Sequence, residues 1–187
     1  ISKLINDKNP ILYDINIELS LYELLNKYHN INVGTYQRLP NNILYYYKKT
    51  ITIETYNKQI TLLNQGNYDT KYKYPSDLII NIKKNVFPFI LYDQHHLLYN
   101  IEINNDEFLN GFFYQIMYPY NNKNYINIFI KEPYKSNLMY VIPNFGLHIN
   151  DNLKGNLFIN IKINNNIKNN NIYDDFIIPK IINPFDE

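Results

Sequence analysis

Among the side chains that perform catalysis or bind metals, histidine is rare in this sequence and cysteine is absent. The 187 residues include four histidines and no cysteine. The lack of cysteine excludes a thiolate nucleophile, a disulfide and a zinc site with cysteine ligands. Asp93, His95 and His96 suggest a zinc site, but adjacent residues of a strand point to opposite faces, and no second histidine cluster completes a ligand set. We therefore predict no metal site and no cofactor.

The sequence also lacks the group of residues that an enzyme requires. Nucleophilic catalysis needs a nucleophile, a base and a group that orients the base. Ser20 is better explained as a helix cap, and the sequence reveals no partner for His29 or His148. We therefore predict no catalytic residues and no enzymatic activity.

Two mixtures of tyrosine and lysine, at residues 45–49 and 71–74, suggest a binding function. Tyrosine can stack on bases and lysine can neutralise phosphates, so a single-stranded RNA-binding module is one alternative. A purely structural β-sandwich subunit is another. The formal net charge is only +1, and no apolar run is long enough to span a membrane. We favour solvated strand faces for both mixtures, and we predict no nucleic-acid partner and no membrane partner.

Two short segments of the sequence each have a similar second copy, in the same order and at nearly the same spacing. Residues 16–26 are echoed by 100–110, and residues 77–83 are echoed by 156–162. The spacing is too long for a solenoid repeat. We therefore predict two tandem copies of a small domain, with the boundary near Tyr92 to His96. The predicted parts are an N-terminal segment 1–10, a first domain 11–93, a second domain 94–163 and an Asn-rich tail or arm 164–187.

The local patterns indicate short strands and very short helices. Residues 15–19 alternate between apolar and polar side chains, which is typical of a half-buried strand. Ser20 with Glu23, and Asn104 with Glu107, form capping boxes that predict a short helix in each copy. Further strands are expected at 31–33, 43–47, 51–53, 60–63, 78–82, 112–117, 126–130, 138–142 and 157–163. The predicted fold class is mainly β, with two tandem β-sandwich domains that each contain a short helix.

Several of these segments resemble the C-terminal region of DnaJ family co-chaperones. Residues 105–116 resemble the family's EALLG-F-x-x-x-I segment, and residues 63–67 resemble the x-N-Q-G-D turn of its first C-terminal domain. Further similarities are the G-D-L strand at 76–80, the H-P-x-F element at 87–90, the G-x-G-M-P turn at 144–147 and a second G-D/N-L strand at 155–157. The similarity covers residues 11–163 in the family's order.

The resemblance implies that the two β-sandwich domains hold unfolded polypeptide for a 70-kDa heat-shock chaperone. The sequence has no zinc-finger insertion, so it resembles the class without that module. Ile1 is not a methionine, and the family's J-domain is absent, so we expect a fragment that does not itself stimulate the partner's ATPase. The tail does not resemble the family's dimerisation segment, which leaves a homodimer through the tail open. We expect a cytoplasmic location.

In this family, peptide lies along an edge strand of the first domain, and its side chains enter a shallow apolar groove. The resemblance places His29 beside the groove, where the family often has lysine. The predicted groove residues are Ile15, Ile17, Ile31, Val33 and Ile90. The alternative is that these five are ordinary core residues. The register of Ile31 and Val33 depends on the deletion of one residue between Asn26 and His29 in the alignment. A slip of one residue would turn their side chains to the opposite face.

Overall fold

The computed structural model describes residues 9, 12–120, 123–130 and 139–164. The predicted N-terminal segment and tail lie almost entirely outside this described part, as does the predicted start of a strand at Leu138. The chain divides into two compact units, Ile1–Asn85 and Val86–Glu187. The sequence places the boundary later, after residue 93. The short strand β7 (Ile90–Tyr92) pairs with β8 (His96–Ile103), and for this reason it belongs to a sheet of the second unit.

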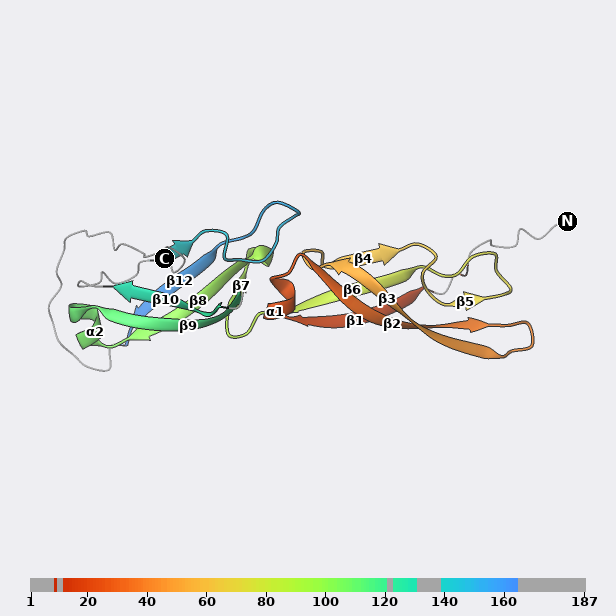
Figure 1. The fold of residues 1–187 in the computed structure, drawn as a ribbon, viewed down its shortest axis with the longest axis horizontal. Coiled ribbons are helices and arrows are strands. Elements are labelled where there is room, and N and C mark those ends of the chain that lie inside the picture. Colours follow the sequence, from red (N-terminus) through yellow and green to blue (C-terminus); the bar gives the residue numbers. More distant parts are fainter. Residues whose placement is uncertain (1–8, 10–11, 121–122, 131–138, 165–187) are drawn as a thin grey trace. The chain divides into compact units, whose positions relative to one another are not determined.

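The first unit contains two three-stranded sheets (Figure 1). One has the order β1-β6-β4, with β1 and β6 parallel and β4 antiparallel to β6. The other has the order β3-β2-β5, in which β2 and β3 form a long antiparallel hairpin. The helix α1 connects β1 to β2. The elements are β1 (Tyr13–Ser20), α1 (Leu21–Leu24), β2 (Tyr28–Arg38), β3 (Leu44–Glu54), β4 (Gln59–Leu62), β5 (Tyr68–Asp69) and β6 (Leu78–Asn85).

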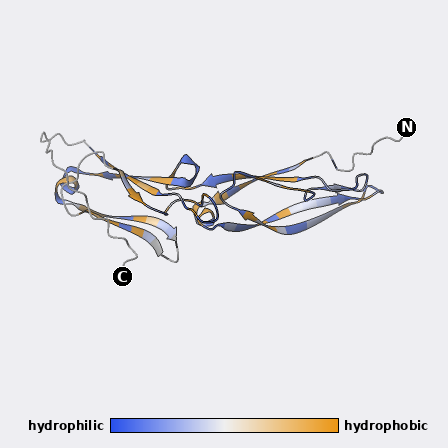
Figure 2. Cartoon of the chain, turned by 90° about the horizontal axis from the view of Figure 1, so that it is seen from above, coloured by the Kyte–Doolittle hydropathy of each residue, from blue (hydrophilic) through white to orange (hydrophobic). Residues whose placement is uncertain are grey.

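The core of the first unit forms from alternate residues of its strands. Leu78 and Ile80 of β6 are fully buried, and Ile53 of β3 is 2% exposed. Figure 2 shows the result as apolar and polar stretches that alternate along the same strands. The two strands expected at 43–47 and 51–53 are one continuous strand, β3, because the antiparallel register with β2 runs without interruption from Leu44 to Glu54.

The second unit has the same kind of architecture. A four-stranded sheet has the order β11-β12-β8-β7, and β9 and β10 form an antiparallel pair. The remaining bounds are a 3-10 turn η1 (Asp93–His95), α2 (Asn105–Asn110), β9 (Phe112–Tyr120), β10 (Lys123–Ile130), β11 (Met139–Ile142) and β12 (Leu157–Ile163). The mainly β fold class is confirmed. No helix in the described residues is both long and apolar enough to cross a membrane.

The duplication seen in the sequence is present in the hydrogen bonds. In each copy, the strand that carries the first repeated segment pairs in parallel with the strand that carries the second, β1 with β6 and β8 with β12. The Nδ2 of Asn81 donates to Oδ1 of Asn16 at 3.1 Å, and the Nδ2 of Asn160 donates to Oδ1 of Asn100 at 2.8 Å. These four asparagines belong to the two repeated segments, so each copy forms the same side-chain hydrogen bond across the equivalent pair of strands.

Each unit also has a turn in which a glycine approaches another backbone segment closely. The N–H groups of Gly66 and Gly146 donate to the carbonyls of Ser76 and Gly155, both at 2.8 Å. A Cβ on Gly66 would lie 2.7 Å from the nearest carbonyl oxygen, and a Cβ on Gly146 would lie 2.5 Å from one. Only glycine fits at these two positions without a shift of the backbone.

Both predicted helix caps are confirmed. The carboxylate of Glu23 accepts hydrogen bonds from the backbone N–H of Ser20 at 2.8 Å and from its hydroxyl at 2.6 Å. Asn104 and Glu107 form the reciprocal pair of a capping box, at 2.8 and 2.9 Å. Gly111 ends α2 with a φ of 83°, a conformation that favours glycine. These caps fix the points at which β1 and β8 end.

Candidate functional site

The strand β2 has one fully paired edge and one largely open edge. It pairs with β3 along its whole length, whereas β5 pairs with it only at residues 37–38. The N–H of Leu39 donates to the carbonyl of Ile43 at the end of the hairpin, so the odd-numbered residues of β2 exchange hydrogen bonds with β3. The even-numbered residues therefore direct their N–H and C=O groups to the other edge. In the described part of the chain, no strand pairs with residues 28–34 on that side.

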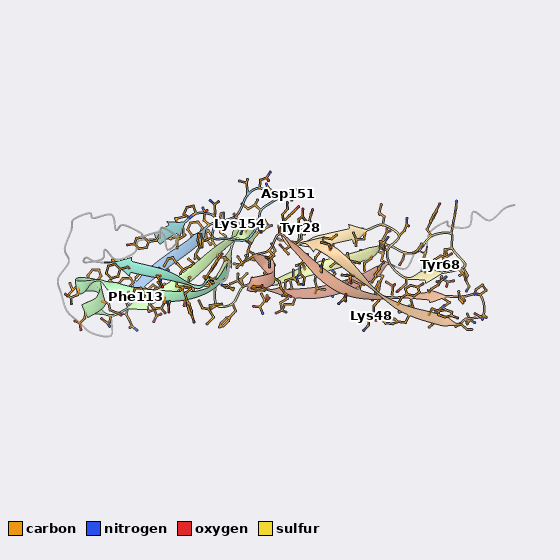
Figure 3. All side chains as sticks on the ribbon, in the orientation of Figure 1. Tyr28, Lys48, Tyr68, Phe113, Asp151 and Lys154 are labelled. Carbon is orange, nitrogen blue, oxygen red and sulfur yellow. The ribbon has the colours of Figure 1, made fainter. Side chains whose placement is uncertain are left out.

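Beyond this stretch, the same edge of β2 is occupied. The hydroxyl of Tyr13 donates to the carbonyl of Gly34 at 2.7 Å. The N–H of Tyr36 donates to Oδ1 of Asn67 at 3.1 Å. The carbonyl of Arg38 then accepts from the N–H of a residue that follows β5, at 3.1 Å. The open part of the edge therefore runs from the start of β2 to the N–H of Gly34. Figure 3 labels Tyr28 at the start of β2 and Tyr68 on β5, beside its far end.

The strand β1 runs beside the open edge. It is the outermost strand of its own sheet. At one end it is joined to β2 by the Tyr13 to Gly34 bond, and at the other end by a chain of contacts from Ser20 through Glu23 to His29. The middle of β1, which carries Ile15 and Ile17, therefore lies between the two connections that join β1 to the ends of the open part of β2.

The structure places five of the six predicted site residues in this part of the first unit. Ile15 and Ile17 on β1 are half-buried. Ile31 and Val33 on β2 are 8% and 3% exposed, so they are part of the core, as the alternative interpretation of these positions expects. Their direct contact with a bound peptide stays a prediction. In the second copy, the position of Ile17 is taken by Ile101, which is fully buried.

Ile90, the sixth predicted site residue, belongs to the other unit. It lies on β7 in the sheet of the second unit, where its Cα partner is Leu98, and it is 51% exposed. The resemblance that placed it with the first domain matched the Phe87–Ile90 segment, which follows the last strand of the first unit. Its sequence position close to that strand gave no indication that β7 pairs forward along the chain.

His29 is held at one end of the open edge by a carboxylate. Its Nε2 lies 3.3 Å from Oε1 of Glu23, and both side chains are about one third exposed or less, at 27% and 33%. The pKa of Glu23 is lowered mainly by the hydrogen bond from the Ser20 hydroxyl and then by the one from the Ser20 backbone N–H. Burial of the carboxyl raises this pKa slightly, and the nearby His29 lowers it by a smaller amount. The ionised carboxylate therefore stabilises the corner between β1, α1 and β2.

This lowered pKa predicts that the first unit loses stability in acid. A carboxyl whose pKa is lowered in the folded state stabilises the fold above its unfolded pKa, and that contribution is lost as the pH falls through the folded value. The melting temperature should therefore fall below about pH 4.5, and the fall should be shallower in Glu23→Gln. The pKa of Glu18 is lowered too, mainly by its hydrogen bond with Lys83, so Glu18→Gln should also make the fall shallower and provides a second test of the same argument. An unchanged pH profile in Glu23→Gln would contradict the assignment.

Two residues of the site, Tyr13 and Asn67, were missed by sequence reasoning. Their contacts with Gly34 and Tyr36 join positions 21 and 31 residues apart, and no local pattern marks such contacts. Burial, followed by the nearby Tyr36 and Tyr46 hydroxyls, raises the pKa of Tyr13. Its hydroxyl therefore remains a protonated donor at neutral pH.

Two histidines, His95 and His96, form hydrogen bonds with the backbone of the second unit. The Nδ1–H of His95 donates to the carbonyl of His148 at 2.7 Å, since a carbonyl can only accept. The Nδ1 of His96 accepts from the N–H of Asn156 at 2.8 Å. Across the described ranges, no three side chains of His, Cys, Asp or Glu are placed to hold a metal ion.

The tyrosine and lysine mixture at residues 45–49 lies on β3. Tyr45, Tyr46 and Tyr47 are exposed, at 53%, 63% and 44%. Lys49 instead donates to the side chain of Gln65 at 2.9 Å, and burial lowers its pKa. The exposed stretch therefore presents tyrosine hydroxyls and rings with less free positive charge than its sequence suggests.

Comparison with known families gives one match. The model of the DnaJ C terminal domain matches residues 13–165, a range that begins with β1 and includes the strands of both units. Comparison with curated proteins gave no match. The matched domain is a non-catalytic chaperone module, which confirms the prediction that the protein is not an enzyme, and it is the client-binding region of co-chaperones. The chain therefore belongs to the DnaJ C-terminal domain family.

Proposed function

We propose that the first unit captures an extended apolar segment of unfolded polypeptide by adding it as a strand to the open edge of β2, and that it passes this client to a 70-kDa heat-shock chaperone. The observation that carries the proposal is the unpaired edge at residues 28–34 next to two half-buried isoleucines of β1. An unpaired edge is a template for another strand, and natural proteins usually cover it.

The backbone of β2 and the isoleucine side chains of β1 would contribute to client binding in different ways. The backbone groups of Tyr28, Asn30 and Asn32 would bond any extended chain, which gives affinity without sequence preference. Ile15 and Ile17 would favour apolar side chains on one face of the added strand, at about 25 cal/mol for each Å² of apolar surface removed from water. Ordering a flexible client costs free energy, so the affinity should be modest and release should be easy. Such release is what transfer to a second chaperone requires.

The test is the binding of fluorescent peptides with alternating isoleucine and serine, followed by anisotropy at low and high salt. Two further peptides carry N-methyl groups on complementary alternate residues. Because the apolar face and the strand direction together fix which edge of the peptide meets β2, a peptide that binds in one direction gives a clear difference: one N-methylated peptide should bind like the parent and the other at least about tenfold more weakly, since it loses several hydrogen bonds of roughly 1 kcal/mol each.

The possible functions give different results in this assay. Strand addition predicts binding that tolerates salt. A steep loss of affinity with salt, together with binding of single-stranded RNA, would support the alternative that uses the exposed tyrosines of β3. Equal binding of both N-methylated peptides would show that clients bind elsewhere on the protein or add to β2 in both strand directions. No binding of any peptide would overturn the proposed client-binding function.

A further inference from the structure

We propose that Tyr13 and Asn67 limit the length of the client segment, so that a strand added to β2 ends at Gly34. This inference rests on the proposed function and concerns which stretch of a client the edge accepts. Two consecutive groups on the edge are already taken: the carbonyl of Gly34 by the Tyr13 hydroxyl at 2.7 Å, and the N–H of Tyr36 by Asn67 at 3.1 Å.

A client strand that continued past Gly34 would need these same two groups. Each of them would have to exchange an existing hydrogen bond for a new one, so further client residues would add little net free energy. Beyond them, residues 37–38 are paired with β5, which closes the rest of the edge. A side chain that satisfies an edge carbonyl without offering another strand edge is a known way to end pairing.

Both blocking side chains are held in place by their own backbones. The N–H of Tyr13 donates to the carbonyl of Asp77 at 3.0 Å, and its Cα partner on β6 is the fully buried Leu78. The carbonyl of Asn67 accepts from the N–H of Ser76 at 2.9 Å. A client would therefore have to displace anchored groups, which costs more than displacing a free surface side chain.

The second copy of the domain has no hydroxyl at the position equivalent to Tyr13. The position of Tyr13 is occupied there by Leu97, whose Cα partner on β12 is Leu157, just as Tyr13 has Leu78 on β6. Leucine has no hydroxyl, so it cannot bond an edge carbonyl. Tyr13→Leu is therefore a substitution that the same fold already accepts at the equivalent position.

The open part of the edge sets a length for the client. Residues 28–34 of β2 are available, and strands rise about 3.3 Å per residue, so the open edge spans about 20 Å. An added strand of about seven residues fills it. Shorter segments leave edge groups unpaired, and longer ones extend past Gly34 without gaining partners.

The experiment measures the affinity of alternating isoleucine and serine peptides of five, seven, nine and eleven residues. For the wild-type chain, affinity should rise up to about seven residues and then stay constant. In the Tyr13→Leu/Asn67→Ala variant, the rise should continue to nine residues, and the nine-residue peptide should bind about three- to tenfold more tightly than it binds the wild type, which corresponds to one or two hydrogen bonds. Tyr22→Leu, at an exposed tyrosine of α1, should behave like the wild type.

Two outcomes would overturn the inference in different ways. If the wild type binds peptides but the double variant keeps the same length limit, the two residues do not set it, and the proposed function stands. If no peptide binds the wild type, the proposed function fails and the length limit fails with it. Should the double variant not fold, Tyr13→Phe removes the hydroxyl alone, and a shift of its length limit toward longer peptides decides the question.

Discussion

Replacement of Asn32 by proline is expected to weaken the binding of an extended apolar peptide by at least about tenfold while the first unit stays folded. Asn32 is an exposed, even-numbered residue of β2, so its N–H faces the open edge and not β3. Proline removes that donor and places its ring where the added strand would lie. Proline is tolerated in a strand when its missing N–H faces an unpaired edge. Peptide anisotropy and the melting temperature together measure both effects.

The control for this change is Asn32→Ala. Alanine keeps the backbone N–H and removes only the side-chain amide group, whose Oδ1 accepts a hydrogen bond from the Thr50 hydroxyl at 2.9 Å on the exposed face. Its peptide affinity should match that of the wild type. A proline variant that binds peptide as well as the alanine variant would show that the open edge is not used.

Replacement of Leu78 by alanine is expected to lower the free energy of unfolding of the first unit by about 2–5 kcal/mol. Leu78 has no exposed surface, and it lies in the central strand of the β1-β6-β4 sheet, with Cα partners Tyr13 and Leu62. The loss combines the transfer of the side chain to water with the cavity that remains. Denaturant unfolding with circular dichroism measures it.

A matched substitution separates burial from residue type. Leu44→Ala removes the same atoms from the tip of the β2–β3 hairpin, where the side chain is 56% exposed, and should cost less than about 0.5 kcal/mol. The equivalent of Leu78 in the second unit is Leu157, which is also fully buried, so Leu157→Ala should cost about as much as Leu78→Ala. Equal losses at Leu44 and Leu78 would contradict the placement of the core.

Much of the fold could be predicted because local sequence patterns, such as apolar–polar alternation and helix caps, determine many of its elements. Alternation at residues 15–19 marks β1, and the caps at Ser20 and Asn104 mark the two helices. The short strands β5 and β7 were missed, because two or three residues are too few for a period to be visible. The sequence predicts two strands where the structure has the single long β3, because the polar residues 48–50 separate the apolar segments on either side.

The site could be predicted only in part. The resemblance located β1 and β2, but the sequence does not show which strand edges stay unpaired, since that depends on contacts between distant segments. For Ile31 and Val33 the sequence leaves open contact with peptide or a place in the core; their low exposure agrees with the second, and the first stays a prediction. Tyr13 could not be recognised, because its role comes from a bond to Gly34 on another sheet.

The parallel pairing of β1 with β6 has a consequence for how the first unit forms. Asn16 and Asn81 meet across that pair although 65 residues separate them, so the unit has many contacts of high sequence separation. Such topologies fold slowly, because the long loop must close before its contacts contribute. During synthesis, β1 has no partner in its sheet until β6 has left the ribosome. Until then, this member of a client-binding domain family exposes an unpaired strand of its own, which is the kind of segment that such domains bind.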